Sequence, residues 1–168
     1  TSATAWTAIG RMRLAAGSPD RAIDAVKRAQ AANPQAEGPA LLALEMVDAK
    51  QPEAEQLFKQ YLAGKPLPEL RMAYARVLVD AQRYSEAAEQ VKAVTAQKPD
   101  YPEAWLIQGT LQLQDNQDAQ AETSLKRYLE LAPSQKSAED RRAGEAQAYL
   151  GLSRVAERRK DYALANAW

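Results

Sequence analysis

Histidine and cysteine are both absent from this sequence of 168 residues. Without them, the chain can form no Ser–His–Asp triad, no Cys–His pair and hardly any zinc site. Glycine is scarce, with seven scattered residues, so neither a P-loop nor a G-x-G-x-x-G fingerprint occurs. The missing cysteine also removes the usual indicator of redox compartment. The chain therefore lacks the residue sets on which most catalytic and cofactor-binding sites depend.

Long apolar runs and an excess of one charge are missing as well. No stretch of about 18 apolar residues predicts a transmembrane helix, and no apolar start with basic flanks predicts a signal peptide. Lys and Arg together number 22, as do Asp and Glu, so no overall field attracts nucleic acid or an anionic membrane. The basic runs at 141–142 and 158–160 are short and lie among acids. We expect no nucleic-acid binding.

Carboxylate pairs are present, but capping and solvation explain them. Asp115 and Asp118 lie in a predicted turn, and Glu139 and Asp140 lie on the side of a predicted helix. Acid–base catalysis by two carboxylates needs them across a cleft, with separated pKa values. We therefore expect no enzyme activity, no metal and no cofactor; turnover abolished by one carboxylate change would reverse this interpretation.

A repeated helical pattern is present instead, and the segment from Pro99 to Pro133 is its template. Trp105 is followed four residues later by Gly109, then by Ala121 and Leu125. Small residues are needed where two helices cross closely, and a proline ends the second helix. The crossing alanines recur at intervals of 32, 33, 34 and 42 residues, at Ala22, Ala54, Ala87, Ala121 and Ala163, and the closing prolines are Pro34, Pro66, Pro99 and Pro133.

This pattern resembles the tetratricopeptide repeat (TPR), whose signature is W-x2-L-G-x2-Y…A-x3-F…P. The template departs from it where Gln108 and Gln112 replace the usual Leu and Tyr. The resemblance implies an all-α fold, a right-handed superhelical solenoid of antiparallel helix pairs. It also implies a single array with repeats at about 3–34, 35–67, 68–101, 102–135 and 136–168.

Two repeats depart from the regular length. In the short second repeat, the register that turns Ala40, Ala43, Leu44 and Val47 inward is preferred, because the alternative buries Glu45. In the last repeat, Ser137 to Lys160 reads as one helix of more than twenty residues, followed by a truncated second helix. Its inner positions are assigned to Gln147, Leu150, Gly151, Arg154 and Ala163. Its first two turns are expected to project, either as a solvated extension or as an edge that meets a partner or further repeats. Because both ends interrupt repeats, we expect a piece of a longer protein.

TPR arrays bind partners on the concave wall lined by the first helix of each repeat, and the resemblance places specific side chains there. Six apolar residues among them predict an exposed patch for a partner helix or peptide, with Arg11 and Arg76 at its edge. These six are Met72, Val79, Leu106, Leu113, Leu152 and Val155. The Lys and Asn set of the TPR carboxylate clamp is mostly missing, so chaperone-tail binding is not supported. The predicted wall residues are Thr7, Arg11, Leu14, Met72, Arg76, Val79, Leu106, Thr110, Leu113, Gln114, Leu152 and Val155.

Other interpretations of this apolar patch stay open. Neighbouring helices or further repeats can cover it, and the same residues can form a homodimer interface. The leading hypothesis is a non-catalytic protein-binding scaffold, and the alternative is a structural or self-associating segment. A concentration-independent monomer in sedimentation would remove that alternative.

A closer resemblance is carried by PELRMAYARVLVDAQRYSEAAEQ, KPDYPEAWLIQG and EDRRAGEAQAYLGLSRVAERRKDYALANAW. These phrases are similar to a bacterial, Gram-negative family of periplasmic TPR lipoproteins, whose best-known kind delivers a carboxyl-terminal processing protease to cell-wall hydrolases. The resemblance implies a protease or its substrates as partners, and membrane attachment only through a lipid anchor outside this sequence. It favours the periplasmic face of the outer membrane, with the cytoplasm as the alternative, although no lipobox cysteine is present.

Overall fold

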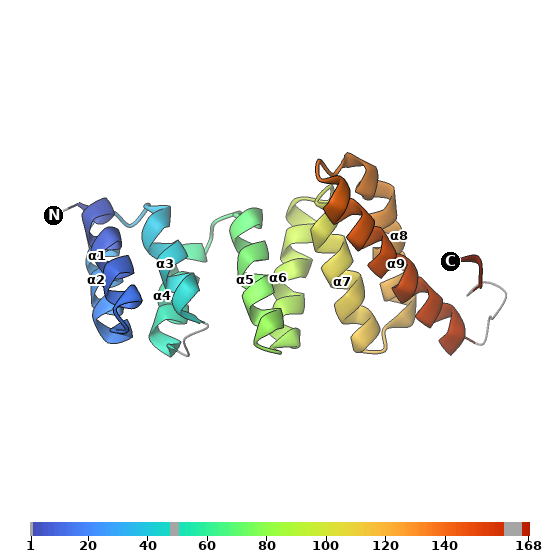
Figure 1. Ribbon diagram of the computed structural model, residues 1–168, viewed down its shortest axis with the longest axis horizontal. Helices are drawn as coiled ribbons and strands as arrows, with labels where there is room; N and C mark the ends of the chain where they lie inside the picture. The colour runs from blue at the N-terminus through green and yellow to red at the C-terminus, as the bar shows by residue number, and fades with distance from the viewer. Residues whose placement is uncertain (1, 48–50, 160–165) are drawn as a thin grey trace. The chain divides into compact units, whose positions relative to one another are not determined.

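Every regular element in residues 2–47, 51–159 and 166–168, which the computed structural model describes, is helical. Successive helices form antiparallel pairs joined by short turns (Figure 1), which confirms the all-α, TPR-like solenoid of helix pairs. The chain forms two compact units, Thr1–Leu67 and Pro68–Trp168. The helices are α1 (Ala3–Ala15), α2 (Pro19–Ala32), α3 (Glu37–Val47), α4 (Pro52–Leu62), α5 (Pro68–Asp80), α6 (Tyr84–Gln97), α7 (Pro102–Gln114), α8 (Asp118–Leu131) and α9 (Ala138–Arg158), with a 3-10 turn at Ala132–Ser134.

Three of the turns within helix pairs share one geometry. Gly17, Gln82 and Asn116 have φ angles of 74°, 59° and 59°, the left-handed conformation that ends helices. In each turn the next residue's N–H donates to a carbonyl five residues earlier, at 2.8–2.9 Å, as in a Schellman motif. The repeat in sequence is therefore also a repeat in backbone conformation, although only the first turn has glycine at the left-handed position.

The N-terminal unit packs α1 and α2 against α3 and α4 around small crossing residues. A Cβ on Gly10 would lie 2.7 Å from Leu42 Cδ2, so the close approach requires glycine there. Ala22 and Phe58 are fully buried between the helices. In α3, Ala40, Ala43 and Leu44 are buried, Val47 is half-buried and Glu45 is exposed, which confirms the preferred register.

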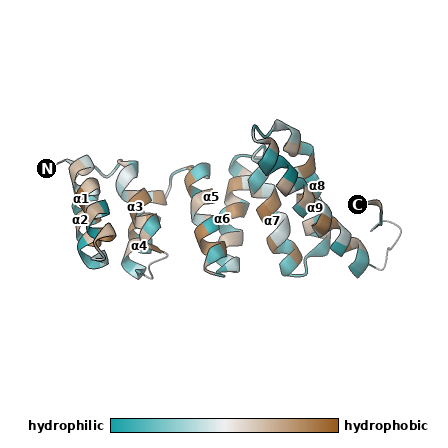
Figure 2. Cartoon of the chain, in the orientation of Figure 1, coloured by the Kyte–Doolittle hydropathy of each residue, from teal (hydrophilic) through white to brown (hydrophobic). Residues whose placement is uncertain are grey.

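The C-terminal unit begins with the same packing in α5 to α8. Tyr74 and Leu78 of α5 are buried, and Gly109 of α7 meets Leu125 of α8, whose Cγ would lie 2.7 Å from an added Cβ. Hydrophobic and hydrophilic segments alternate along these helices, whereas the first turns of α9 are hydrophilic (Figure 2). The core of this unit therefore follows the small-against-large alternation that the sequence predicts.

Helix α9 is as long as expected, with 21 residues, and crosses α7 and α8 obliquely (Figure 1). Its first turns are exposed at Ala138, Glu139 and Asp140, as a projecting end requires. The buried stripe then begins at Gly144, where an added Cβ would lie 2.7 Å from Tyr128 Cζ and closer still to the hydroxyl. This stripe consists of Gly144, Ala148, Gly151, Leu152, Val155 and Ala156.

The predicted inner face of α9 is wrong apart from Gly151. Leu150 is 54% exposed, and Gln147 and Arg154 are exposed too, whereas Leu152 is 1% exposed. The physical reason is that α9 lies on α8 with a different side from the one that the template assigns. Ala163, the remaining predicted inner position, lies outside the described residues.

Candidate partner-binding surface

In the N-terminal unit, the first helices α1 and α3 frame a small groove. Its volume is about 310 Å³, and its walls include Thr4, Thr7, Ala8 and Arg11 of α1 and Gly38 of α3. The space is open because side chains such as Ala8 and Gly38 are small. A Cβ added to Gly38 would reach within 3.5 Å of the Thr7 methyl carbon and narrow the groove. Thr7 and Arg11, both predicted wall residues, thus line a real hollow.

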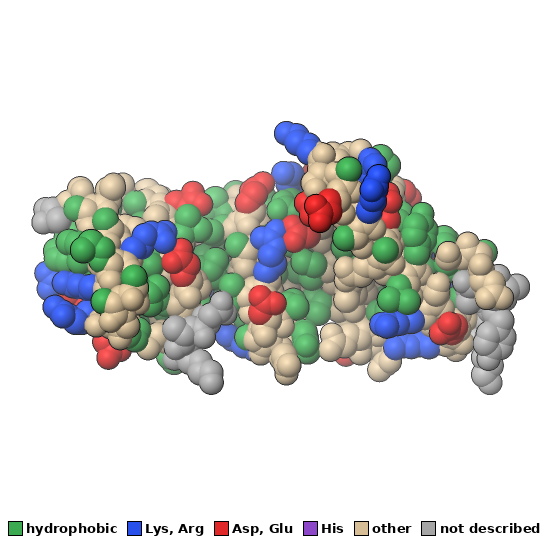
Figure 3. Space-filling view, in the orientation of Figure 1, with side chains coloured by type: hydrophobic (Ala, Val, Ile, Leu, Met, Phe, Trp, Pro, Cys, Tyr) green, Lys and Arg blue, Asp and Glu red, His purple; other side chains and the backbone are tan. Residues whose placement is uncertain are grey.

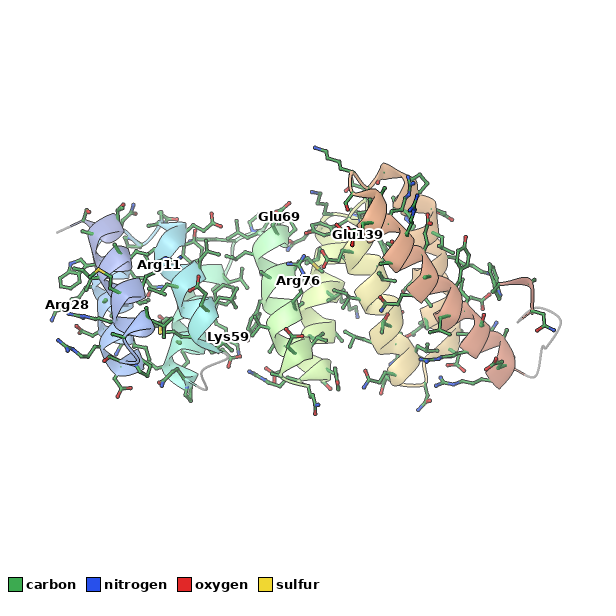
Figure 4. The ribbon with its side chains drawn as sticks, viewed as in Figure 1. Arg11, Arg28, Lys59, Glu69, Arg76 and Glu139 are labelled. Carbon is green, nitrogen blue, oxygen red and sulfur yellow. The ribbon has the colours of Figure 1, made fainter. Side chains whose placement is uncertain are left out.

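A charged pair stands at one edge of this groove. Arg11 reaches from α1 toward α3 (Figure 4), and its Nη1 donates to Glu45 Oε1 at 2.8 Å. Both side chains remain about half exposed, at 47% and 50%. The pair fixes the direction of the guanidinium but leaves part of it open to solvent, so it can still meet a ligand carbonyl or carboxylate.

The C-terminal unit has polar links between its first helices at the equivalent places. Arg76 of α5 donates to Glu103 of α7 through two nitrogens, with Nε to Oε1 at 2.7 Å (Figure 4 labels Arg76). This hydrogen bonding raises the pKa of Arg76. Gln147 Nε2 of α9 donates to Thr110 Oγ1 of α7 at 3.2 Å. The predicted Arg76 and Thr110 therefore face neighbouring helices, as wall residues should, but each already has a partner within the chain.

Four of the six apolar wall residues are buried, so the exposed patch expected from the sequence is wrong. Met72 packs with Val91, Val94 and Ala104 in the core between α5, α6 and α7. Leu113 and Val155 pack together on Ala121, and Leu152 packs on Leu125 and Tyr128. Burial by helices of their own chain leaves Met72, Leu113, Leu152 and Val155 unavailable to a partner.

The remaining predicted residues are only partly accessible. Leu14, Val79 and Leu106 are half-buried, and Leu106 packs against the cluster of Leu125 and Tyr128. Gln114 is exposed but lines a different groove, between α6 and α8. Their role in binding a partner stays a prediction. The face of the first helices is more polar than expected, with mixed charges visible in Figure 3.

An apolar surface that the sequence analysis missed lies on the outer side of α9. Tyr149 stacks with Trp168 at a ring-centroid distance of 6.4 Å, and Lys126 Nζ lies 5.7 Å from the Trp168 ring. Leu150 is exposed beside Tyr149, and both rings are partly exposed. The signal was in the sequence, but assigning Leu150 to the inner side of the helix concealed it.

The described part of the chain was compared with the requirements of metal sites, membrane-spanning helices and catalytic acids. No group of three or more acidic side chains in it is arranged to hold a metal ion. None of its helices is both long and apolar enough to cross a membrane. Its shifted carboxyl pKa values are lowered, as at Glu122, where hydrogen bonds from Lys126 and Arg159 outweigh the effect of burial. A catalytic acid would instead need a raised carboxyl pKa.

Comparison with known proteins agrees with this architecture. The tetratricopeptide repeat family matches residues 2–37 and 72–136, while a search of curated proteins gives no match. MamA from Desulfovibrio magneticus RS-1, from residue 41 onward, is 18% identical with a TM-score of 0.68, over 98% of this chain and 89% of that chain. YrrB, described as a TPR protein with an unusual peptide-binding site, is 16% identical with a TM-score of 0.66, over 95% of this chain and 79% of that chain.

A third solved structure is the C-terminal part of a TPR repeat-containing protein from Cytophaga hutchinsonii. It is 16% identical with a TM-score of 0.79, over 99% of this chain and 66% of that chain. At such identities the likeness concerns the fold alone. The family match, however, covers more than half of the chain, and it includes the close helix crossings at Gly10 and Gly109. With its recurring crossings, its shared turns and this match, the chain belongs to the tetratricopeptide repeat family.

Proposed function

We propose that this chain is a non-catalytic scaffold that binds a peptide segment of a partner protein on the face of its first helices. The supporting observation is the groove between α1 and α3, which is lined by Thr7, Arg11 and small side chains. The fold is that of a protein-interaction module, and the similar fold of YrrB has a peptide-binding site according to its description. A peptide fits this groove better than the apolar helix of the sequence hypothesis, because the groove offers hydroxyls and a guanidinium beside its small side chains.

The groove supplies both shape and hydrogen bonds. Ala8 and Gly38 leave room for a backbone to approach, and the half-exposed Arg11 offers N–H groups that its bond to Glu45 does not use. A ligand carboxylate or carbonyl beside Arg11 would gain a charge-assisted hydrogen bond. We therefore expect bound peptides to contain an acidic residue or a free carboxyl end.

A phage-displayed library of random peptides tests this proposal. Peptides selected on the wild-type chain should bind an Ala8→Trp variant at least about tenfold more weakly, because the indole fills the groove. Ala31→Trp, at an exposed alanine of α2 outside the groove, is the matched control and should bind like wild type. Selection of no peptides, or equal binding to both variants, contradicts the proposal.

Self-association is a second candidate function, and the exposed Tyr149, Leu150 and Trp168 favour it. Exposed apolar clusters mark interaction sites, and a second copy of the chain would bury this one. Sedimentation velocity should then show a larger species at high concentration, and Leu150→Glu should remove it. A monomer at all concentrations excludes this candidate.

The more specific role is that of an envelope adaptor for a carboxyl-terminal processing protease. Its support is the sequence resemblance to periplasmic TPR lipoproteins. The test is a pull-down from a periplasmic extract with the wild-type chain and the Ala8→Trp variant. Recovery of such a protease by wild type alone supports the role, and recovery of cytosolic partners only contradicts it.

A further inference from the structure

A second groove lies where the sequence departs from the TPR signature. It occupies about 520 Å³ between α6 and α8, above α7, and lies wholly within the C-terminal unit. The binding surface proposed above does not include it. Tyr84 and Lys92 of α6 are among its lining residues, together with five glutamines of α7, α8 and the turn between them: Gln108, Gln112, Gln114, Gln117 and Gln120.

Comparison with the preceding helix pair explains why this groove is open. In α5, Tyr74 directly precedes the small crossing residue Ala75, and Leu78 follows three residues later; both large side chains are buried. In α7, Gln108 and Gln112 hold the equivalent places around Gly109. The two carboxamides provide neither the apolar volume of Tyr74 and Leu78 nor their burial, so the space between α6 and α8 stays accessible and polar.

The floor of this groove is a continuous chain of hydrogen bonds. Thr95 Oγ1 donates to Gln108 Oε1 at 2.9 Å, and Gln108 Nε2 donates to Ser124 Oγ at 3.2 Å. Ser124 Oγ then donates to Gln112 Oε1 at 2.6 Å. Thr95 and Ser124 are 7% and 2% exposed, so this series of hydrogen bonds begins and continues at buried side chains. Such a network holds both glutamines in fixed orientations.

The orientation leaves one donor group for a ligand. The Gln112 amide nitrogen donates no hydrogen bond to another described residue. Among the described residues, the buried side-chain atom without a partner is Arg71 Nε, so the Gln112 nitrogen is not a buried, unpaired atom. Its two N–H groups are therefore held at the accessible floor by a carboxamide whose oxygen is already used. Around it, Gln114 and Gln120 add exposed carboxamides with both donors and acceptors.

The chemistry of these side chains indicates the ligand. A carboxamide offers the same donor and acceptor types as a peptide group, so a row of glutamines can pair with successive N–H and C=O groups of an extended backbone. The lining has one basic side chain, Lys92, and two acidic ones, Glu89 and Asp115. The Asp115 carboxylate already accepts a hydrogen bond from Gln117 Nε2 at 2.7 Å. The two acids disfavour an acidic ligand, and Lys92 disfavours a basic one, so an uncharged ligand fits this groove best. Tyr84, 36% exposed, offers a ring for one ligand side chain.

We propose that the groove between α6 and α8 binds a short, uncharged, extended polypeptide segment through its glutamine carboxamides. Main-chain hydrogen bonds supply the affinity, and the contact with Tyr84 selects side chains. This second peptide site is independent of the groove between α1 and α3, so either site can fail experimentally without affecting the other.

Side-chain amide resonances in a ¹⁵N–¹H NMR spectrum of the whole chain test the proposal directly. The probe is an acetylated, amidated tetrapeptide of alternating threonine and valine, which is neutral and prefers extended conformations. Titration up to about 1 mM should shift the NH₂ peaks of Gln108 and Gln112 in a saturable manner. Gln112→Tyr, which restores the signature residue, should abolish these shifts at Gln108.

A rim variant and a control keep the test decisive if Gln112→Tyr fails to fold. Gln120→Trp changes an exposed residue and should abolish the shifts by blocking the groove. Gln147→Leu, on the first-helix face, should leave them unchanged. No saturable shift, shifts that persist in Gln120→Trp, or the same shifts from neutral maltotetraose but not from the peptide would each overturn the proposal.

Discussion

At the residue scale, glycines set how closely the helices approach. Gly144 of α9 lies over the Tyr128 ring, whose hydroxyl donates to Gln135 Oε1 at 2.9 Å. Tyr128 is fully buried, so the ring has little freedom to move away from an added methyl group. The position therefore requires glycine for packing and not for backbone conformation.

We predict that Gly144→Ala lowers the free energy of unfolding by about 1–3 kcal/mol, as overpacking does. The sign is informative, since alanine in place of glycine in an unconstrained helix interior stabilises by about 0.5–1 kcal/mol. Chemical denaturation measures the change. In a Tyr128→Phe background the loss should be smaller; an equal loss would exclude the hydroxyl as its cause.

The left-handed turn at Gln82 suggests a stabilising change. For a residue other than glycine, the left-handed conformation costs about 1–2 kcal/mol of conformational free energy. The equivalent residue of the first helix pair is Gly17. Gln82→Gly should therefore raise the melting temperature, although the added freedom of the unfolded chain offsets part of the gain. Gly17→Ala is the reciprocal control and should lower it.

Glu122 of α8 gives the stability a defined pH dependence. Hydrogen bonds from Lys126, with a further one from Arg159 of α9, lower its pKa below 4.5. A carboxyl whose pKa is lower in the folded state stabilises the fold above its unfolded pKa, and this contribution disappears as the pH falls through the folded value. Glu122→Gln should therefore flatten the decline of unfolding free energy below pH 4.5. Chemical denaturation at a series of pH values measures this decline, and the same decline in Glu122→Gln as in wild type would contradict the contribution of this carboxyl.

At the element scale, α9 is the helix whose orientation the repeat pattern predicts least well. Its buried stripe meets Leu125 and Tyr128 of α8 and Leu113 of α7. Arg158 adds a bond to Asp118 at 2.7 Å and Arg159 one to Glu122 at 2.5 Å, which fix the last turn of α9 on α8. The helix thus covers the end of the α7–α8 pair and leaves its other side exposed.

Two leucines of α9 provide a matched test of this orientation. Leu152→Ala should lower the unfolding free energy by about 2–5 kcal/mol because it opens a cavity in the core. Leu150→Ala, two residues away and 54% exposed, should change it by less than about 0.5 kcal/mol. Urea titrations of both variants measure the difference. The reverse order would mean that the template assignment of Leu150 was correct.

At the scale of the whole molecule, the main packing contacts link each helix only to its next one or two neighbours. Stability in such repeat proteins is a sum of local terms, and unfolding can be local. The balanced charge, 22 basic and 22 acidic residues, adds no long-range field to couple distant parts.

We predict that Leu152→Ala weakens the fold locally. Hydrogen exchange should become faster in α7, α8 and α9, because α9 packs on α7 and α8. Helices α1 to α3 belong to the other compact unit and should keep their wild-type protection. Exchange followed by mass spectrometry of peptides resolves the two regions. Equal loss of protection along the chain would instead indicate one cooperative structure.

The sequence by itself determined the helical repeat and its close crossings. The small residues Gly10, Gly109 and Ala121 allow two helices to cross closely, and their spacing can be read directly from the sequence. The register of α3 was equally predictable, because the alternative buries the charge of Glu45.

Only the tertiary structure decided which sides of the helices are covered. The rotation of α9 about its axis depends on the surface of α7 and α8 on which it packs, where the Tyr128 ring lies against Gly144. No local sequence pattern predicts this contact. The same packing buries Leu113, Leu152 and Val155, while α6 and α7 bury Met72, so the predicted apolar wall is closed. The glutamine-lined groove shows what each level of structure contributes. Gln108 and Gln112 could be recognised in the sequence as departures from the signature, but the groove that they leave open depends on the spacing of α6 and α8.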